Sequence, residues 1–115
     1  MAMINFRDEN NEVLELSVKN KVSAETRCLW QVILHFVMDE IRGSINEDDS
    51  SDKLYEVPDH IAVKSEDILK YSGHKKEHSL EKAIEELTSI GLIESIKNEE
   101  ENSYTFAINY LTKKL

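Results

Sequence analysis

The chain has 115 residues, of which 40% are hydrophobic and 32% charged, a composition typical of one globular domain with a single modest core. Its formal net charge of −9 repels nucleic acid at long range and suits a basic partner better. No apolar run reaches the roughly 20 residues that cross a bilayer, so we expect no membrane partner. Residues 1–13 lack the pattern of a signal peptide, and Cys28 is the only cysteine, so we expect a cytoplasmic location.

The first 22 residues are the most ambiguous part of the chain. Val13, Leu14 and Leu16 fit either a short helix or a strand, and we treat residues 1–22 as an N-terminal arm. The arm has more apolar residues than a free tail needs, which suggests that it mediates dimer formation. These residues are Ile4, Phe6, Val13, Leu14 and Leu16.

The clearest predicted element is a long helix that begins at Ser23, a good N-cap, and stops at Gly43. Its apolar residues recur three or four positions apart, as on one face of a helix. They are Leu29, Trp30, Ile33, Phe36, Val37 and Ile41. The helix is apolar over much of its circumference, so we expect it at the centre of the core. We accordingly expect Trp30 to be buried rather than an exposed binding anchor, and Cys28 to be buried or half-buried.

An acidic loop follows the long helix. Residues 44–60 are polar, contain the single proline and are predicted to be irregular, with a short extended piece at 53–57. Ile61 and Val63 then fit a second short extended piece.

Two shorter helices come next. Ser65 is predicted to cap the first, which buries Ile68 and Leu69 and ends at Gly73. The second covers about residues 76–90 and ends before another glycine. Its apolar stripe consists of Leu80, Ala83, Ile84, Leu87 and Ile90.

The C-terminal part changes from helical spacing to strand alternation. Residues 92–96 are predicted to be a strand, 97–103 a turn and 104–108 a second strand. The order of the elements predicts an α+β, mainly helical fold. This order is a long helix, a loop, a short helix, a turn, a helix and a hairpin. The specific fold that this order predicts is a winged helix-turn-helix, with a three-helix core and a C-terminal β-hairpin as the wing. We assign residues 23–115 to this domain, including the acidic loop 44–60.

Several segments of this domain resemble a known family. The stretches KVSAETRCLWQVILHF, SEDILKYSG, LEKAIEELTSIGLIESI and YTFAI are similar to the N-terminal winged-helix domain of phage replisome organisers and DnaD-type primosomal proteins. The most specific positions are Ser23, Ala24, Leu29, Trp30, Leu87, Gly91, Leu92 and Ile93. The resemblance implies a non-enzymatic protein of phage or mobile-element type that binds double-stranded DNA or acts as a replication-linked adaptor. It also implies self-association, here as a homodimer.

The candidate nucleic-acid-binding residues lie at the start of the second helix of the helix-turn-helix, the part that faces the major groove in such motifs. Between residues 64 and 82 the chain has five lysines against four acids, so this region is locally positive. Lysines there can bind phosphates, and a serine can bind a base or a phosphate. The candidates are Lys75, Lys76, His78, Ser79 and Lys82. The alternative is a solvated, mixed-charge helix face, because Glu81, Glu85 and Glu86 would repel phosphates.

Two acidic clusters support a second hypothesis, in which the domain is a protein-interaction module. It would then dock on a basic host or phage protein and modulate it without binding DNA. One cluster lies in the loop, and the other lies at the predicted wing tip, where a DNA-contacting wing would carry Arg or Lys. The candidate docking residues are Glu47, Asp48, Asp49, Asp52, Glu99, Glu100 and Glu101. Solubility and loop chemistry are the simpler explanation of such clusters.

The motif H-x-x-E-H, formed by His74, Glu77 and His78, matches the spacing of inverted zinc peptidases. Such a site needs one continuous helix, whereas Gly73 directly precedes this motif and places it at a turn. Two lysines inside the motif also oppose a cation. No glycine-rich phosphate loop, nucleophile elbow or carboxylate pair is visible elsewhere. We therefore expect no metal, no cofactor and no enzymatic activity.

Overall fold

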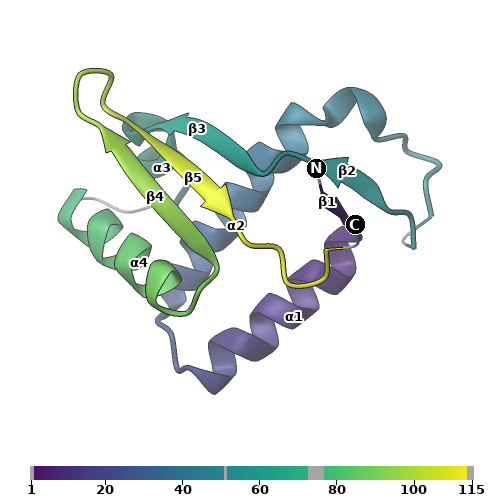
Figure 1. Ribbon diagram of the computed structural model, residues 1–115, viewed down its shortest axis with the longest axis horizontal. Helices are drawn as coiled ribbons and strands as arrows, with labels where there is room; N and C mark the ends of the chain where they lie inside the picture. The colour runs from purple at the N-terminus through teal and green to yellow at the C-terminus, as the bar shows by residue number, and fades with distance from the viewer. Residues whose placement is uncertain (1, 51, 73–76, 114–115) are drawn as a thin grey trace.

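The computed structural model describes residues 2–50, 52–72 and 77–113, and within them the chain forms four α-helices and two small antiparallel sheets (Figure 1). Within these ranges, no helix combines the length and the apolar character that a membrane span requires. In chain order, the elements are β1 (Ala2–Ile4), α1 (Phe6–Lys19), α2 (Ala24–Glu40), a 3-10 turn η1 (Arg42–Ser44), β2 (Tyr55–Val57), β3 (His60–Lys64), α3 (Ser65–Ser72), α4 (Glu77–Ser89), β4 (Ile93–Asn98) and β5 (Ser103–Ile108). The predicted α+β class is confirmed.

Helix α2 is the central core helix, as its periodicity predicts. Ser23 caps it by accepting a hydrogen bond from the Thr26 backbone N–H at 3.2 Å. Trp30 is 2% exposed, which confirms its place in the core, and Cys28 is half-buried. The helix ends at Glu40, slightly before the predicted stop, because a 3-10 turn that contains Gly43 takes over.

A three-stranded sheet closes the same core. Its order is β3-β5-β4, so the C-terminal hairpin β4–β5 is joined by the short strand that precedes α3. On the inner face, Ile61 and Val63 of β3 lie opposite Phe106 and Tyr104 of β5, and all four side chains are buried. They belong to one hydrophobic cluster with the inward residues of α2, α3 and α4. The predicted hairpin and the short extended piece at Ile61 are therefore confirmed.

The passage from α4 into β4 depends on Gly91. Its φ angle of 82° is left-handed, which a glycine adopts without steric cost. The turn is closed by the Leu92 N–H, which donates to the Leu87 carbonyl at 3.1 Å. This geometry turns the chain sharply enough for β4 to pack beside α4, with Leu92 and Ile93 buried.

The N-terminal segment, predicted to be an arm, packs against the main hydrophobic cluster. It forms β1, which pairs with β2 from the acidic loop, and the 14-residue helix α1. Ile4 is fully buried and Val13 is 4% exposed, and both belong to the main hydrophobic cluster. Phe6 and Leu16 pack against that cluster, while Leu14 is 52% exposed. The apolar residues that suggested dimer formation therefore serve mainly the chain's own core.

A buried carboxylate holds the C-terminal segment against α1. Glu9 is 1% exposed and accepts hydrogen bonds from the backbone N–H groups of Leu111 and Thr112, both at 2.9 Å. The Thr112 hydroxyl donates a third bond, at 2.7 Å. Beside it, the buried Tyr110 hydroxyl donates to the Pro58 carbonyl at 2.8 Å, and burial raises the pKa of this phenol. We refer to Glu9, Leu111 and Thr112 as the Glu9 clasp.

The start of α3 differs from prediction in one detail. Ser65 is the first residue of the helix, but its buried hydroxyl has no hydrogen-bond partner among the described residues, so its predicted capping role is wrong. Its backbone N–H instead donates to the Asn102 carbonyl at 2.9 Å. The β4–β5 turn therefore meets the start of α3, and this contact replaces a side-chain cap. Ile68 is fully buried and Leu69 partly buried, as predicted, whereas Gly73 lies outside the described residues.

Candidate nucleic-acid interface and acidic surfaces

Helix α4 carries the candidate nucleic-acid-binding residues that the structure describes. It buries Leu80, Ala83, Ile84 and Leu87, as predicted, and so turns its other side toward solvent. Ser79 is half-buried in the first turn and Lys82 is exposed in the second. Lys75 and Lys76 lie outside the described residues, and of His78 only the backbone, within α4, is described. Lys82 is thus the exposed cation on this helix that tests the DNA hypothesis most directly.

Glu86, expected to repel phosphates, is instead engaged with the start of α2. Its Oε2 atom accepts a hydrogen bond from the Thr26 hydroxyl and another from the Ser23 hydroxyl at 3.0 Å. The bond from Thr26 is the main reason why the pKa of Glu86 is lowered, and Ser23 and Lys82 contribute in the same direction against partial burial. Because the N-terminus of a helix is positive, a carboxylate there is also favoured by the helix dipole. Glu86 therefore joins α4 to α2 and is not a free surface acid.

Replacing Glu86 with glutamine is expected to lower the free energy of unfolding at pH 7 by about 0.5–2 kcal/mol, because neutral hydrogen bonds are weaker than charged ones. A carboxylate whose pKa is lowered in the folded state stabilises the fold above its ordinary pKa, 4.5 for this group, and loses this effect as pH falls through the lowered value. The difference between wild type and Glu86→Gln should therefore shrink in acid. Urea unfolding at pH 7 and pH 3.5 measures it, and the exposed Glu85→Gln is the matched control. An equal difference at both pH values would contradict this assignment.

Lys97 on β4 lies next to α4, and sequence analysis missed it. Its ammonium group is 3.8 Å from the Glu81 carboxylate of α4 and 5.7 Å from the centroid of the Tyr104 ring. Glu81 is therefore paired with a cation rather than left to repel an anion. The strand register that places Lys97 opposite Tyr104 is a tertiary feature that the alternation pattern alone does not specify.

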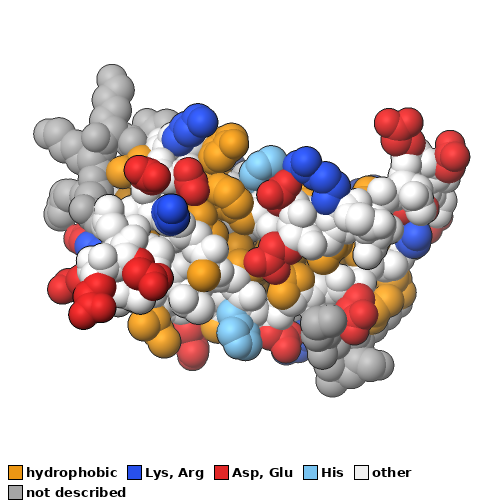
Figure 2. Space-filling view, turned by 90° about the horizontal axis from the view of Figure 1, so that it is seen from above, with side chains coloured by type: hydrophobic (Ala, Val, Ile, Leu, Met, Phe, Trp, Pro, Cys, Tyr) orange, Lys and Arg blue, Asp and Glu red, His pale blue; other side chains and the backbone are white. Residues whose placement is uncertain are grey.

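The tip of the β4–β5 hairpin is acidic and exposed, as predicted. Glu99, Glu100 and Glu101 are all exposed, and the turn closes through Asn102, which adopts a left-handed φ of 49°. The Asn98 side chain supports the turn by accepting from the Glu101 backbone N–H at 3.3 Å. In Figure 2, Asp and Glu side chains are visible at both ends of the molecule and also between them.

The four acids predicted for docking in the loop fall into two groups. Asp49 is structural: it accepts hydrogen bonds from the Tyr55 hydroxyl at 2.6 Å and from the Asn46 backbone N–H at 3.0 Å, and its side chain is 15% exposed. The bond from Tyr55 is the main reason why its pKa is lowered. Asp52 forms an exposed ion pair with Arg7 at 2.8 Å. Glu47 and Asp48 are exposed and are the loop acids most open to a partner.

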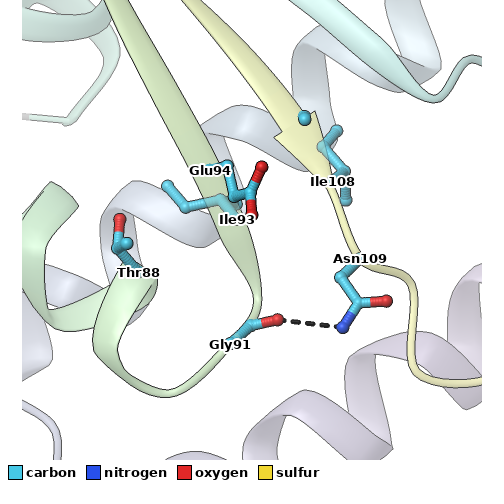
Figure 3. Close-up of a pocket in the computed structure, with 7 residues that line it drawn as sticks. Thr88, Gly91, Ile93, Glu94, Ile108 and Asn109 are labelled. Atoms are coloured by element: carbon cyan, nitrogen blue, oxygen red, sulfur yellow. Dashed lines mark hydrogen bonds between the residues drawn. The ribbon is translucent and has the colours of Figure 1, made fainter.

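An open groove of about 320 Å³ lies where α4 passes into the sheet (Figure 3). The Asn109 side chain donates to the Gly91 carbonyl across it at 3.0 Å, and Glu94 is the only titratable group among its lining residues. The lining residues are Thr88, Gly91, Ile93, Glu94, Ala107, Ile108 and Asn109. The Thr88 hydroxyl among them donates to the Ile84 carbonyl at 2.8 Å and is therefore engaged within α4.

The described residues contain no group of three or more His, Cys, Asp and Glu side chains that could hold a metal ion. The side chains of the H-x-x-E-H motif lie outside the described residues. That motif is therefore not tested, and a metal-free motif stays a prediction from the sequence.

Comparison with known proteins found no matching protein family, no curated protein and no solved structure.

Proposed function

We propose that residues 23–115 form a winged helix-turn-helix and that the protein is a cytoplasmic, non-enzymatic DNA-binding or replication-linked adaptor of phage or mobile-element type. The element order α2, β3, α3, α4, β4, β5 and the sheet order β3-β5-β4 support this proposal. In such a fold α3 and α4 are the helix-turn-helix, and the β4–β5 hairpin is the wing. The resemblance to replication domains also implies self-association as a homodimer. The burial of the N-terminal apolar residues in the chain's own core does not support this part of the proposal.

The orientation of α4 carries the proposal. Its apolar side is buried, and Ser79 and Lys82 lie in its first two turns, where a recognition helix contacts DNA. Glu86 and Glu81 are engaged by neighbouring groups, so repulsion along the helix is weaker than the sequence suggests. The acidic hairpin tip would stay clear of the phosphates, so duplex contact would be confined to the start of α4.

Because few phosphates would be neutralised, the affinity for duplex DNA is expected to fall gently with salt, with a log–log slope of about −2 to −4. Lys82→Ala, Lys75→Ala and Lys76→Ala should each reduce that slope by about one and weaken all sequences alike. Replacing Glu99, Glu100 and Glu101 with glutamine should strengthen binding, because it lowers the negative charge that repels the phosphates at a distance. Fluorescence anisotropy across a salt series measures both effects.

Lys19→Ala is the matched control, because Lys19 is an exposed lysine in the last turn of α1, outside the proposed interface. It should leave affinity and slope unchanged. Absence of duplex binding at low salt, in both the wild type and the triple glutamine variant, would exclude this function.

The second candidate function is the acidic protein-interaction module. It is favoured by the exposure of Glu47 and Asp48 in the loop that follows η1 and of the glutamates at the tip of the β4–β5 hairpin. In the loop cluster Asp49 and Asp52 already pair with Lys53 and Arg7, so Glu47 and Asp48 would be the main contacts of a basic protein there. This function predicts binding of a cationic peptide, measured by calorimetry, that the triple glutamine variant or a Glu47→Gln, Asp48→Asn variant loses.

A further inference from the structure

Three aromatic rings from two helices meet at the surface between α2 and α3. The ring centroids of His35 and Tyr71 are 5.3 Å apart, those of Phe36 and Tyr71 are 5.6 Å apart, and those of His35 and Phe36 are 5.5 Å apart. These separations lie in the range of favourable ring contacts. We refer to these three residues as the aromatic patch.

The patch is ordered by its own contacts and yet open to solvent. Tyr71 is 53% exposed although its ring touches two others, and His35 is exposed beside the half-buried Phe36. Rings that pack against one another lose part of their side-chain freedom before any ligand binds. A planar group that stacks on the patch would therefore cost little additional conformational entropy.

Two basic side chains lie near residues of the aromatic patch. The Lys70 ammonium is 5.7 Å from the centroid of the Tyr71 ring. An open groove of about 300 Å³ is lined by both His35 and Arg42, and the Arg42 guanidinium pairs with Asp39. Figure 2 shows hydrophobic side chains and a histidine between Lys or Arg side chains on the upper edge of the view. In a chain of net charge −9, cations gathered around exposed rings favour an anionic ligand with planar groups.

We propose that the aromatic patch binds single-stranded nucleic acid by stacking an unpaired base on Tyr71, with Lys70 and Arg42 beside the phosphates. A duplex does not offer an open base face, whereas a single strand does, and stacking on aromatic side chains tolerates any base sequence. Asp39 offsets part of the charge of Arg42, so Lys70 is the main cation of the site. This inference extends the proposed function, since it adds an unpaired strand to the duplex that α4 would hold.

The test measures anisotropy of a fluorescent short oligothymidylate with the full-length protein at low salt. Tyr71→Ala is expected to weaken binding by about 5- to 150-fold, the range for loss of one stacked base, while Tyr71→Phe keeps most of the affinity. Lys70→Gln should reduce the log–log salt slope by about 0.7, as for one phosphate contact on a single strand. Lys19→Gln, which alters another exposed lysine in a last helical turn, should change nothing. Circular dichroism confirms that each variant folds.

Two further substrates separate this inference from the proposed function. A blunt duplex and the same duplex with an oligothymidylate extension are compared. Tighter binding of the extended duplex, with the gain lost in Tyr71→Ala and duplex affinity unchanged, supports the inference. The inference is wrong if Tyr71→Ala and Lys19→Gln lose the same affinity, or if the protein binds the two substrates equally. Neither result contradicts the proposed binding of duplex DNA. Tyr71-dependent binding of the single strand without duplex binding supports the inference and removes the proposed function. If no single strand binds the wild type, the inference is wrong, and an acidic protein segment becomes the remaining ligand for the patch.

Discussion

Replacing Glu9 with alanine is expected to lower the free energy of unfolding by about 2–4 kcal/mol, because it leaves the backbone N–H groups of Leu111 and Thr112 in the Glu9 clasp without their acceptor. Each of these groups loses a bond to a charged oxygen, which is stronger than a bond to a neutral one. The Thr112 hydroxyl loses its acceptor as well. Urea denaturation followed by the far-ultraviolet signal measures the loss.

Two variants and one local measurement make this prediction specific. Glu9→Gln keeps an acceptor oxygen without the charge, so its loss should lie between those of wild type and Glu9→Ala. Glu12→Ala changes an exposed acid on the same helix and should cost less than about 0.5 kcal/mol. Hydrogen exchange of the Leu111 and Thr112 amides should accelerate in Glu9→Ala. If it does not, the C-terminal segment is held by other contacts and the role given to Glu9 is wrong.

Leu87→Ala is expected to lower the free energy of unfolding by about 2–5 kcal/mol, because it opens a cavity in the core between α4, α2 and the sheet. Leu87 is 1% exposed and belongs to the main hydrophobic cluster. Its carbonyl also accepts the bond that closes the turn at Gly91, which the substitution leaves intact. The effect should therefore come from lost packing alone.

Glu85→Ala is the control for Leu87→Ala, since it lies two residues away on the exposed side of α4 and replaces a good helix former with the best one. It should change the stability by less than about 0.5 kcal/mol. Duplex binding by Leu87→Ala should survive at temperatures where the variant remains folded, because Leu87 does not face the proposed interface. A loss below about 1 kcal/mol would mean that α4 packs less tightly than its burial indicates.

Most of the main core could be predicted from the sequence, because it depends on local periodicity. Helices α2 and α4 repeat apolar residues every three or four positions, and β5 buries Tyr104 and Phe106 with the less buried Thr105 between them, so each pattern specifies one face. Glycine at position 91 likewise marks a helix end through a backbone property of the residue itself. These features need no knowledge of which segment packs against which.

The structure of the N-terminal segment and the roles of the acidic residues could not be predicted, because they depend on contacts between segments that are distant in the sequence. The short apolar stretch in α1 fits both the helical and the strand period. The strand β1 before it pairs with β2, which lies more than 50 residues further along the chain. Asp49, Asp52 and Glu86 read as surface charges because acids are usually exposed, yet each meets a specific donor or cation. Sequence spacing does not reveal those partners.

The sequence by itself therefore determined the α+β class, the central helix, the apolar face of α4, the C-terminal hairpin and the acidic balance of the chain. Only the tertiary structure decided that the N-terminal segment joins the core, that Glu9 holds the C-terminal residues and that α2 and α3 bring three aromatic rings together. The physical reason is the range of the interactions. Periodicity and turn propensity act within a few residues, whereas hydrogen bonds and ring contacts between distant segments form only once folding has set their positions.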